Sequence, residues 1–225
     1  MIGGGLGGLT AAALVASAGR TVTVHEGRGR FGGRGTTDSR DGFRFNRGPH
    51  ALYLAGEAHR VLGSIGITPV GAAPMTTGAL MADGDMFGLA PGSPISLLRS
   101  RMLGARDKVA LARILTRLDR LDPTPLASVS TRDWVDDMTT RPRVREILHT
   151  VIRLATYCAI PEVLSAEVAL TQMQLALGRG VIYLDFGWEQ LVSALAATPG
   201  IPFETNSRVG ELPDAPAVIV GASES

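Results

Sequence analysis

The sequence is short of cysteine and of long apolar runs, and each shortage excludes a class of protein. Cys158 is the only cysteine, so no disulfide can form within the chain, and the lone thiol favours a reducing cytoplasm. No run of about 18 or more apolar residues is present, which excludes a transmembrane helix. Glycines begin at Gly3, so we expect no signal peptide.

The chain also has almost no excess of basic over acidic residues, although arginine is common. The formal net charge is +1, whereas a surface for nucleic acid needs a concentrated basic excess, so we expect no nucleic-acid partner. Lys108 is the only lysine, and this arginine bias is typical of a GC-rich, bacterial genome. With 45% hydrophobic and 19% charged residues, the 225-residue chain has the composition of a globular protein with a core.

What the sequence does have is a glycine cluster at its start, which satisfies the pattern G-x-G-x-x-G. A small-residue helix is expected from Leu9 to Ala18 and a buried β-branched strand from Thr21 to Glu26. Strand, turn, helix and strand in this order open a parallel α/β unit that binds a dinucleotide. The fingerprint residues assigned to the cofactor are Gly3, Gly5, Leu6, Gly7 and Gly8.

Each position of the fingerprint has a mechanical reason. Gly3 permits the tight turn, Gly5 lets the backbone approach a pyrophosphate, and Gly8 lets helix and sheet pack closely. The N–H groups at the helix N-terminus then face the phosphates. Glu26, at the end of the second strand, would accept hydrogen bonds from a ribose and repel a 2′-phosphate, which disfavours NADP. The alternative is a glycine turn with no ligand, and the fingerprint does not separate NAD from FAD.

A second motif, Arg30-Phe31-Gly32-Gly33-Arg34, follows directly. It resembles the R-x-G-G-R element of the superfamily of FAD-dependent amine oxidases, phytoene desaturases and protoporphyrinogen oxidases. The resemblance implies that FAD is the cofactor, that Gly32 and Gly33 line it, and that Arg34 approaches its phosphates. Gly27, next to Glu26, is assigned to the same site. The alternative interpretation is an arginine-rich surface loop.

The resemblance continues along the chain. The segment from Gly42 to His50 is similar to the family's G-F-x-F-D-x-G-P-H stretch, which implies that Gly48, Pro49 and His50 run toward the flavin ring. Asn46 replaces the usual aspartate of this stretch, and His50 is equally well read as a packed histidine.

Two later segments extend the resemblance toward the C-terminal part of the sequence. Gly180 to Trp188 resembles the segment that returns from the substrate domain, with Phe186-Gly187 where the family prefers two glycines. Val209 matches the valine that meets adenine.

The sequence therefore predicts an α/β fold with a Rossmann-like FAD/NAD(P)-binding domain whose parallel sheet is incomplete. Residues 1–68 and 181–225 are expected to form this domain, interrupted by a mostly helical substrate domain over 69–180. Family chains are about twice as long, and their Gly-Asp element over the ribityl chain would lie beyond Ser225. Only Met1 and Ile2 precede the glycines, so we expect a misassigned or clipped start. We also expect these 225 residues alone to bind FAD weakly and not to turn over substrate.

The predicted function is that of an FAD-dependent oxidoreductase acting on an apolar, isoprenoid-like substrate. No catalytic residue and no metal ligand is assigned, and the oligomeric state stays open. The alternatives are a flavin amine oxidase, a non-enzymatic prenyl-binding protein of the Rab GDP-dissociation-inhibitor type, and an inactive truncated remnant.

The region from Leu97 to Leu121 has a local basic excess of five charges. A basic amphipathic helix of this kind can lie on anionic lipid, which would place the protein peripherally on a membrane. The alternative is a solvated helix face over an ordinary core, with Leu111, Ile114, Leu115, Leu118 and Leu121 on the buried side.

Overall fold

The computed structural model describes residues 1–74, 79–82, 85–89 and 103–221, and the chain divides into two compact units. Unit 1 combines Met1–Ala73 with Val181–Ser225, and unit 2 is Pro74–Gly180. Unit 1 continues past residue 68 because strand β5 (Gly71–Ala72) pairs with strand β8 (Val181–Leu184). That unit 1 serves the cofactor and unit 2 the substrate stays a prediction.

Unit 1 contains a parallel ladder in the order expected of a Rossmann fold. Strand β1 (Val24–His25) pairs in parallel with β9 (Phe203–Glu204), and single parallel bridges join Ile2 to His25 and to Val220. Along the sequence, Ile2 comes first, β1 second, β9 third and Val220 fourth. Across the ladder the order is β9, β1, Ile2 and Val220, which is 3-2-1-4. The predicted α/β class is confirmed.

The strands of this ladder are shorter than the sequence predicts. The β-branched run from Thr21 to Glu26 forms a strand only over Val24–His25. The apolar run from Ala217 to Val220 also predicts a buried strand, but it forms only a bridge at Val220. At its carboxyl edge the ladder ends where Gly3 (φ 97°) begins the turn into α1, after its N–H has donated to the His25 carbonyl.

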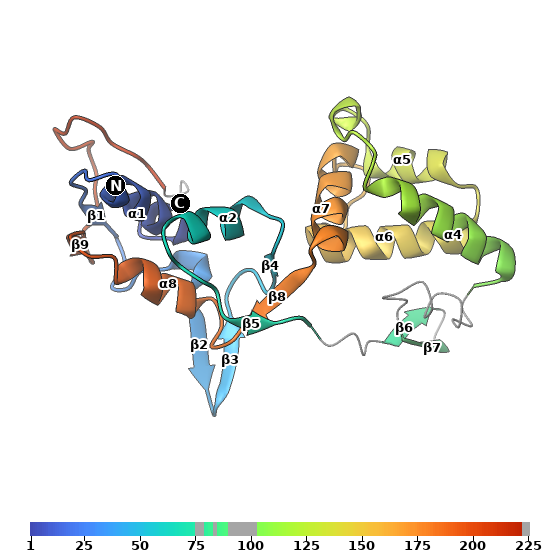
Figure 1. The fold of residues 1–225 in the computed structure, drawn as a ribbon, viewed down its shortest axis with the longest axis horizontal. Helices are drawn as coiled ribbons and strands as arrows, with labels where there is room; N and C mark the ends of the chain where they lie inside the picture. The colour runs from blue at the N-terminus through green and yellow to red at the C-terminus, as the bar shows by residue number, and fades with distance from the viewer. Residues whose placement is uncertain (75–78, 83–84, 90–102, 222–225) are drawn as a thin grey trace. The chain divides into compact units, whose positions relative to one another are not determined.

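Helices α1 (Leu6–Ser17) and α8 (Glu189–Ala196) pack on each other in unit 1, as Figure 1 shows, while α2 (Glu57–Ser64) adjoins β4 (Leu52–Tyr53). Helix α1 begins three residues earlier than predicted because Gly5 is extended and serves as its N-cap. The shared core contains Leu9, Ala13, Leu52, Leu62, Leu184, Trp188, Leu191, Val192 and Leu195.

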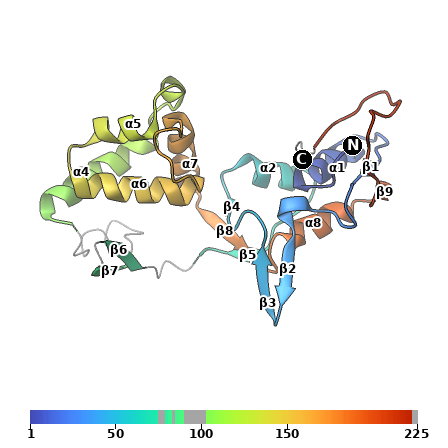
Figure 2. The same cartoon turned by 180° about the vertical axis from the view of Figure 1, so that it is seen from behind.

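Two antiparallel sheets accompany the ladder. Strand β8 lies between β4 and β5, which ties the returning chain to the first part of the unit. Strands β2 (Thr37–Arg40) and β3 (Phe43–Asn46) form a separate hairpin, which extends away from the helices of unit 1 (Figure 2).

Strand β2 was not predicted from the sequence, which indicated a loop from Gly27 to Arg47 ending in one short strand. Of its residues, Thr-Asp-Ser-Arg, only threonine favours a strand, and aspartate disfavours it. The missed signal was the turn, because Asp41 (φ 52°) and Gly42 (φ 80°) both have positive φ, as an Asp-Gly hairpin turn requires.

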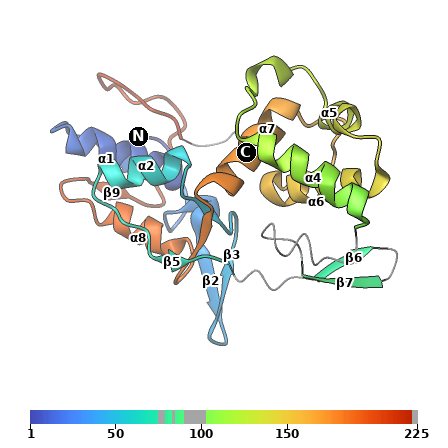
Figure 3. The same ribbon diagram turned by 45° about the vertical axis from the view of Figure 1, so that its right-hand side comes forward.

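Unit 2 is mostly helical, as expected (Figure 3). Its helices are α4 (Ala105–Leu118), α5 (Thr131–Met138), α6 (Pro142–Thr156) and α7 (Ala166–Gly178), and it also contains strands β6 (Ala79–Ala82) and β7 (Asp85–Leu89). Short 3-10 turns cover Gly33–Gly35 in unit 1 and Thr124–Leu126 in unit 2.

In the sequence, Ser130 with Asp133 three residues later resembles a capping box, and Ser165 is predicted to cap the helix that follows it. Both caps are present in the structure. The Ser130 hydroxyl accepts the Asp133 N–H at 3.1 Å, and the Ser165 hydroxyl accepts the Glu167 N–H at 3.2 Å. Leu111 and Leu118 are fully buried on the inner face of α4, whereas Leu121 is 41% exposed because the helix ends before it. The residues from Leu97 to Met102 lie outside the described residues.

The packing of Gly8 gives a stability prediction with a matched control. A Cβ at Gly8 would overlap the carbonyl oxygen of Gly3, whereas a Cβ at the exposed Gly7 would meet open space. We expect Gly8→Ala to lower the free energy of unfolding by about 1–3 kcal/mol, as overpacking does. Gly7→Ala should instead raise it by up to about 1 kcal/mol, because alanine favours the helix. Urea denaturation of both variants measures this, and equal effects would contradict the close packing of α1 on the sheet.

Candidate functional site

The fingerprint loop leaves the sheet at the carboxyl end of the first strand, where ligands bind in parallel α/β folds. Gly3 has φ 97°, which L side chains rarely adopt, and its N–H donates to the His25 carbonyl at 2.8 Å. Gly5 and Gly7 are different, because a Cβ at either one would meet no protein atom within 4 Å. Packing within the described residues therefore does not require glycine at positions 5 and 7, and the open space beside them is available to a ligand.

The Arg30–Arg34 loop lies directly against the fingerprint loop. The Gly32 N–H donates to the Gly4 carbonyl at 2.7 Å, and Gly5 and Gly32 form a parallel bridge. A Cβ at Gly33 would lie 3.6 Å from Gly5 Cα. Gly32 has φ 104° and is buried against Val192 of α8, so this helix holds the loop in place. The structure thus joins the two motifs that the sequence separates by about twenty residues.

The carboxylate of Glu26 is held by two backbone donors. Its Oε2 accepts the Gly4 N–H at 2.8 Å, and its Oε1 accepts the Arg28 N–H at 2.9 Å. Each carboxylate oxygen has a further lone pair for another donor. Glu26 is half-buried, so the carboxylate is both oriented and accessible.

The segment that precedes Val209 runs along the loop after Glu26. The Ser207 N–H donates to the Glu26 carbonyl at 2.9 Å, and the Asn206 N–H donates to the Arg28 carbonyl at 2.9 Å. A Cβ at Gly27 would lie 3.9 Å from Arg208 Cβ. Glu26, Gly27 and the half-buried Val209 therefore belong to one edge of unit 1.

His25 anchors this edge from below. Its Nδ1 lies 3.0 Å from Ser207 Oγ and 3.0 Å from Glu204 Oε2. The side chain thus fixes the turn after β9 against β1.

The structure brings only part of the Gly48–His50 prediction to the site. A Cβ at Gly48 would lie 2.5 Å from the Arg34 carbonyl oxygen, so this glycine packs against the Arg30–Arg34 loop. Pro49 and His50 are exposed, and no hydrogen bond or ion pair joins the His50 side chain to another residue in the described ranges. The roles of all these residues toward a cofactor stay predictions.

Sequence reasoning missed a polar network behind the loop. Asn46 Oδ1 accepts the Thr37 hydroxyl at 2.8 Å and the Trp188 N–H at 3.3 Å. The Glu189 N–H donates to Thr37 Oγ1 at 3.2 Å, and Glu189 Oε2 accepts the Thr37 N–H at 3.3 Å. The Asn46 amide oxygen therefore caps the start of α8, a role that needs an acceptor and not a negative charge.

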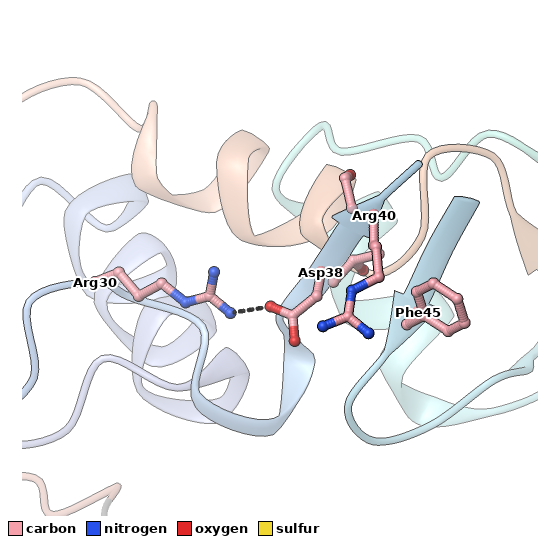
Figure 4. A pocket seen from close by; sticks show the side chains of 6 residues that line it. Arg30, Asp38, Arg40 and Phe45 are labelled. Atoms are coloured by element: carbon pink, nitrogen blue, oxygen red, sulfur yellow. Dashed lines mark hydrogen bonds and ion pairs between the residues drawn. The ribbon is translucent and has the colours of Figure 1, made fainter. Parts of the chain in front are cut away.

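An open hollow of about 640 Å³ lies between Arg30 and the β2–β3 hairpin, and four of its side chains are labelled in Figure 4. Asp38 pairs with Arg30 at 3.0 Å and with Arg47 at 2.7 Å, and these arginines hold the pKa of Asp38 below its usual range. The lining residues are Arg30, Thr37, Asp38, Ser39, Arg40 and Phe45.

Within the described ranges, none of the helices has the length and apolar character needed to cross a bilayer. In the same ranges, no group of three His, Cys, Asp or Glu side chains is placed to hold a metal ion.

Known proteins resemble this chain in sequence and in fold. Phytoene desaturase of Cercospora nicotianae is 42% identical over 66 residues, which are 29% of this chain and 11% of that protein. Carotenoid 3,4-desaturase of Haloarcula japonica is 47% identical over 49 residues, which are 22% of this chain and 10% of that protein.

Among solved structures, an oxidoreductase from Methanosarcina mazei superposes with a TM-score of 0.73 at 21% sequence identity. The match covers 91% of this chain and 50% of that one, so the chain spans about half the length of the solved relative. The family described as flavin containing amine oxidoreductase matches residues 6–218. Because that match extends over nearly all of the sequence, the chain belongs to the flavin containing amine oxidoreductase family.

Proposed function

We propose that the protein is an FAD-dependent oxidoreductase of the desaturase or oxidase type that acts on an apolar, isoprenoid-like substrate. The observation that carries the proposal is the junction of Gly5 with Gly32, which joins the dinucleotide fingerprint to the arginine–glycine loop at the carboxyl end of the sheet. The family is flavin-containing, and the two curated relatives are desaturases.

The residues at this edge fit the adenosine and pyrophosphate parts of FAD. The space beside Gly5 and Gly7 suits a pyrophosphate at the N-terminus of α1. Arg34, which follows the Gly32–Gly33 pair in the adjoining loop, would add positive charge. The oriented carboxylate of Glu26 suits the two ribose hydroxyls. The residues proposed to hold FAD are Gly3, Gly5, Leu6, Gly7, Gly8, Glu26, Gly27, Gly32, Gly33, Arg34, Gly48, Pro49, His50 and Val209.

The chemistry follows from this division of labour. When bound, FAD supplies an acceptor for a hydride or an electron pair from a C–H bond. The residues of this chain bind and orient: Glu26 is fixed by the Gly4 and Arg28 N–H groups before any ribose arrives, so little ordering remains on binding. No side chain is assigned as a base, and rate enhancement would come from positioning.

The substrate is the point on which the desaturase and amine oxidase alternatives differ. The names of the two curated relatives, phytoene desaturase and carotenoid 3,4-desaturase, favour an apolar isoprenoid over an amine. The retained Glu26 and Arg30–Arg34 motifs argue against a binder that needs no flavin. Anaerobic bleaching of bound FAD by phytoene, but not by putrescine or benzylamine, would support the desaturase reading.

We place the protein in the cytoplasm, with peripheral contact to a membrane. Support for the cytoplasm comes from the single thiol of Cys158, which needs no oxidising compartment. Support for the membrane comes from α4, whose exposed face carries Arg106, Arg113 and Arg117, while Asp107 is paired with Arg141 at 2.7 Å.

Removal of Glu26 should weaken FAD binding selectively. Glu26→Ala deletes charge-assisted hydrogen bonds worth about 1.5–3 kcal/mol, so the dissociation constant for FAD should rise about tenfold to a hundredfold. Glu57→Ala is the control, because Glu57 is an exposed residue of the same unit, paired only locally with Arg60. Flavin fluorescence quenching measures both, with circular dichroism to confirm the fold. An unchanged affinity in Glu26→Ala, or purification with bound NAD and no flavin, would contradict the proposal.

Membrane contact through α4 should depend on charge. Co-sedimentation with vesicles should increase with the fraction of anionic lipid and decrease as salt rises, because salt screens exposed charges. The double variant Arg106→Gln/Arg113→Gln should bind less, whereas Arg20→Gln, at an exposed position of unit 1, should bind as the original does. Sedimentation that responds to neither lipid charge nor salt would return α4 to the role of a solvated helix.

A further inference from the structure

Phe186, in the turn between β8 and α8, has a backbone conformation that does not suit its side chain. Its φ is 65°, in the left-handed region, where a bulky L residue is a conformational outlier. The next residue, Gly187, has φ 74°. Two successive positive φ angles explain why a glycine doublet is the easier sequence here, and a phenylalanine at the first position is unfavourable for folding.

The Phe186 ring does not compensate this strain by burial. Its side chain is 64% exposed, although the turn beneath it is tightly held. A Cβ at Gly187 would overlap Thr37 Oγ1 and lie 2.5 Å from Asn46 Oδ1, and the Trp188 N–H donates to the same Asn46 oxygen. The turn therefore holds Phe186 on a fixed base, because Trp188 and Glu189 donate to Asn46 and Thr37 of the β2–β3 hairpin.

Arg44 covers one side of this ring. Its guanidinium carbon lies 5.0 Å from the centroid of Phe186, within the range of a cation–π contact. Side chains alternate along β3, so Arg44 shares a face with Asn46, which contacts the turn itself. No ion pair joins Arg44 to another residue in the described ranges, so no carboxylate there competes with the ring for its guanidinium.

We propose that Phe186 and Arg44 form a stacking platform for a conjugated, planar part of the substrate. This inference rests on the proposed function and names residues that would set substrate preference. Strain kept at an exposed position points to a function for the side chain and not to folding. A guanidinium beside an aromatic ring favours electron-rich π systems, so conjugated double bonds gain a contact that a saturated chain of equal length does not. The names of the matched relatives, phytoene and carotenoid desaturases, include such conjugated molecules.

Binding of all-trans-retinol, followed by its own fluorescence, tests the platform in the full 225-residue chain. Phe186→Gly should raise the melting temperature by about 2–4 °C, because strain is relieved, and should weaken retinol binding about two- to tenfold. Phe186→Leu keeps the backbone strain and the apolar bulk but loses the π face, so it should weaken retinol binding without raising the melting temperature. Phe186→Trp should preserve binding.

Phe43→Ala is the matched control, because Phe43 is 68% exposed but belongs to the opposite face of β3. It should leave retinol binding unchanged. Hexadecan-1-ol, a saturated chain, should displace retinol poorly, and its affinity should be the same for the original protein and for Phe186→Leu. Retinol affinities that are equal in the original, Phe186→Gly and Phe186→Leu would overturn the platform. A lower melting temperature in Phe186→Gly would also overturn it, because the ring would then stabilise the fold by packing.

The FAD titration separates this inference from the proposed function. If the original chain binds FAD and loses affinity in Glu26→Ala while retinol binding ignores Phe186, only the platform fails. If FAD does not bind at all, the proposed function fails, whatever retinol does.

Discussion

The pairing of two glycine-rich loops, Gly3–Gly8 and Arg30–Arg34, is the constraint on which the rest of unit 1 depends. It is made by backbone groups alone, with the Gly32 N–H on the Gly4 carbonyl at 2.7 Å. Glycine is required at particular points of this junction: Gly32 has φ 104°, and a Cβ at Gly8 would overlap the carbonyl oxygen of Gly3. Helix α8 then closes over the second loop through Val192, and the edge with Glu26 and Val209 is arranged around the result.

Polar contacts help to fix the position of this junction. Thr37, Asn46 and Glu189 connect the strand after the Arg30–Arg34 loop to the first turn of α8. Each of these groups accepts a hydrogen bond from a backbone or side-chain donor that would otherwise have no partner near the core. The substitution of asparagine for the family's aspartate at position 46 fits this picture, because only an oxygen acceptor is used.

Local chemistry was readable from the sequence, and long-range pairing was not. The glycine fingerprint, the caps at Ser130 and Ser165 and the helix α4 depend on residues within a few positions of one another, so their pattern predicted them. The bond from Thr37 to Glu189 spans 152 residues, and no local spacing could indicate it. Strand β2 was missed for another reason. Its residues are weak strand formers, and it is a strand because the Asp41-Gly42 turn brings it against its partner β3.

The division of unit 1 into two stretches of sequence also sets the order in which the protein can fold. His25 meets Ser207 across 182 residues, and β1 has no neighbour on that side until β9 is present. During synthesis, unit 2 is complete before the chain reaches residue 203, so its helices, rich in local contacts, can form first. Until β9 and α8 have been synthesised, the N-terminal glycine loops lack these partners, and the side of α1 that packs on α8 stays uncovered. Translation speed between residues 181 and 221, and the availability of chaperones in that interval, would therefore affect the yield of native protein.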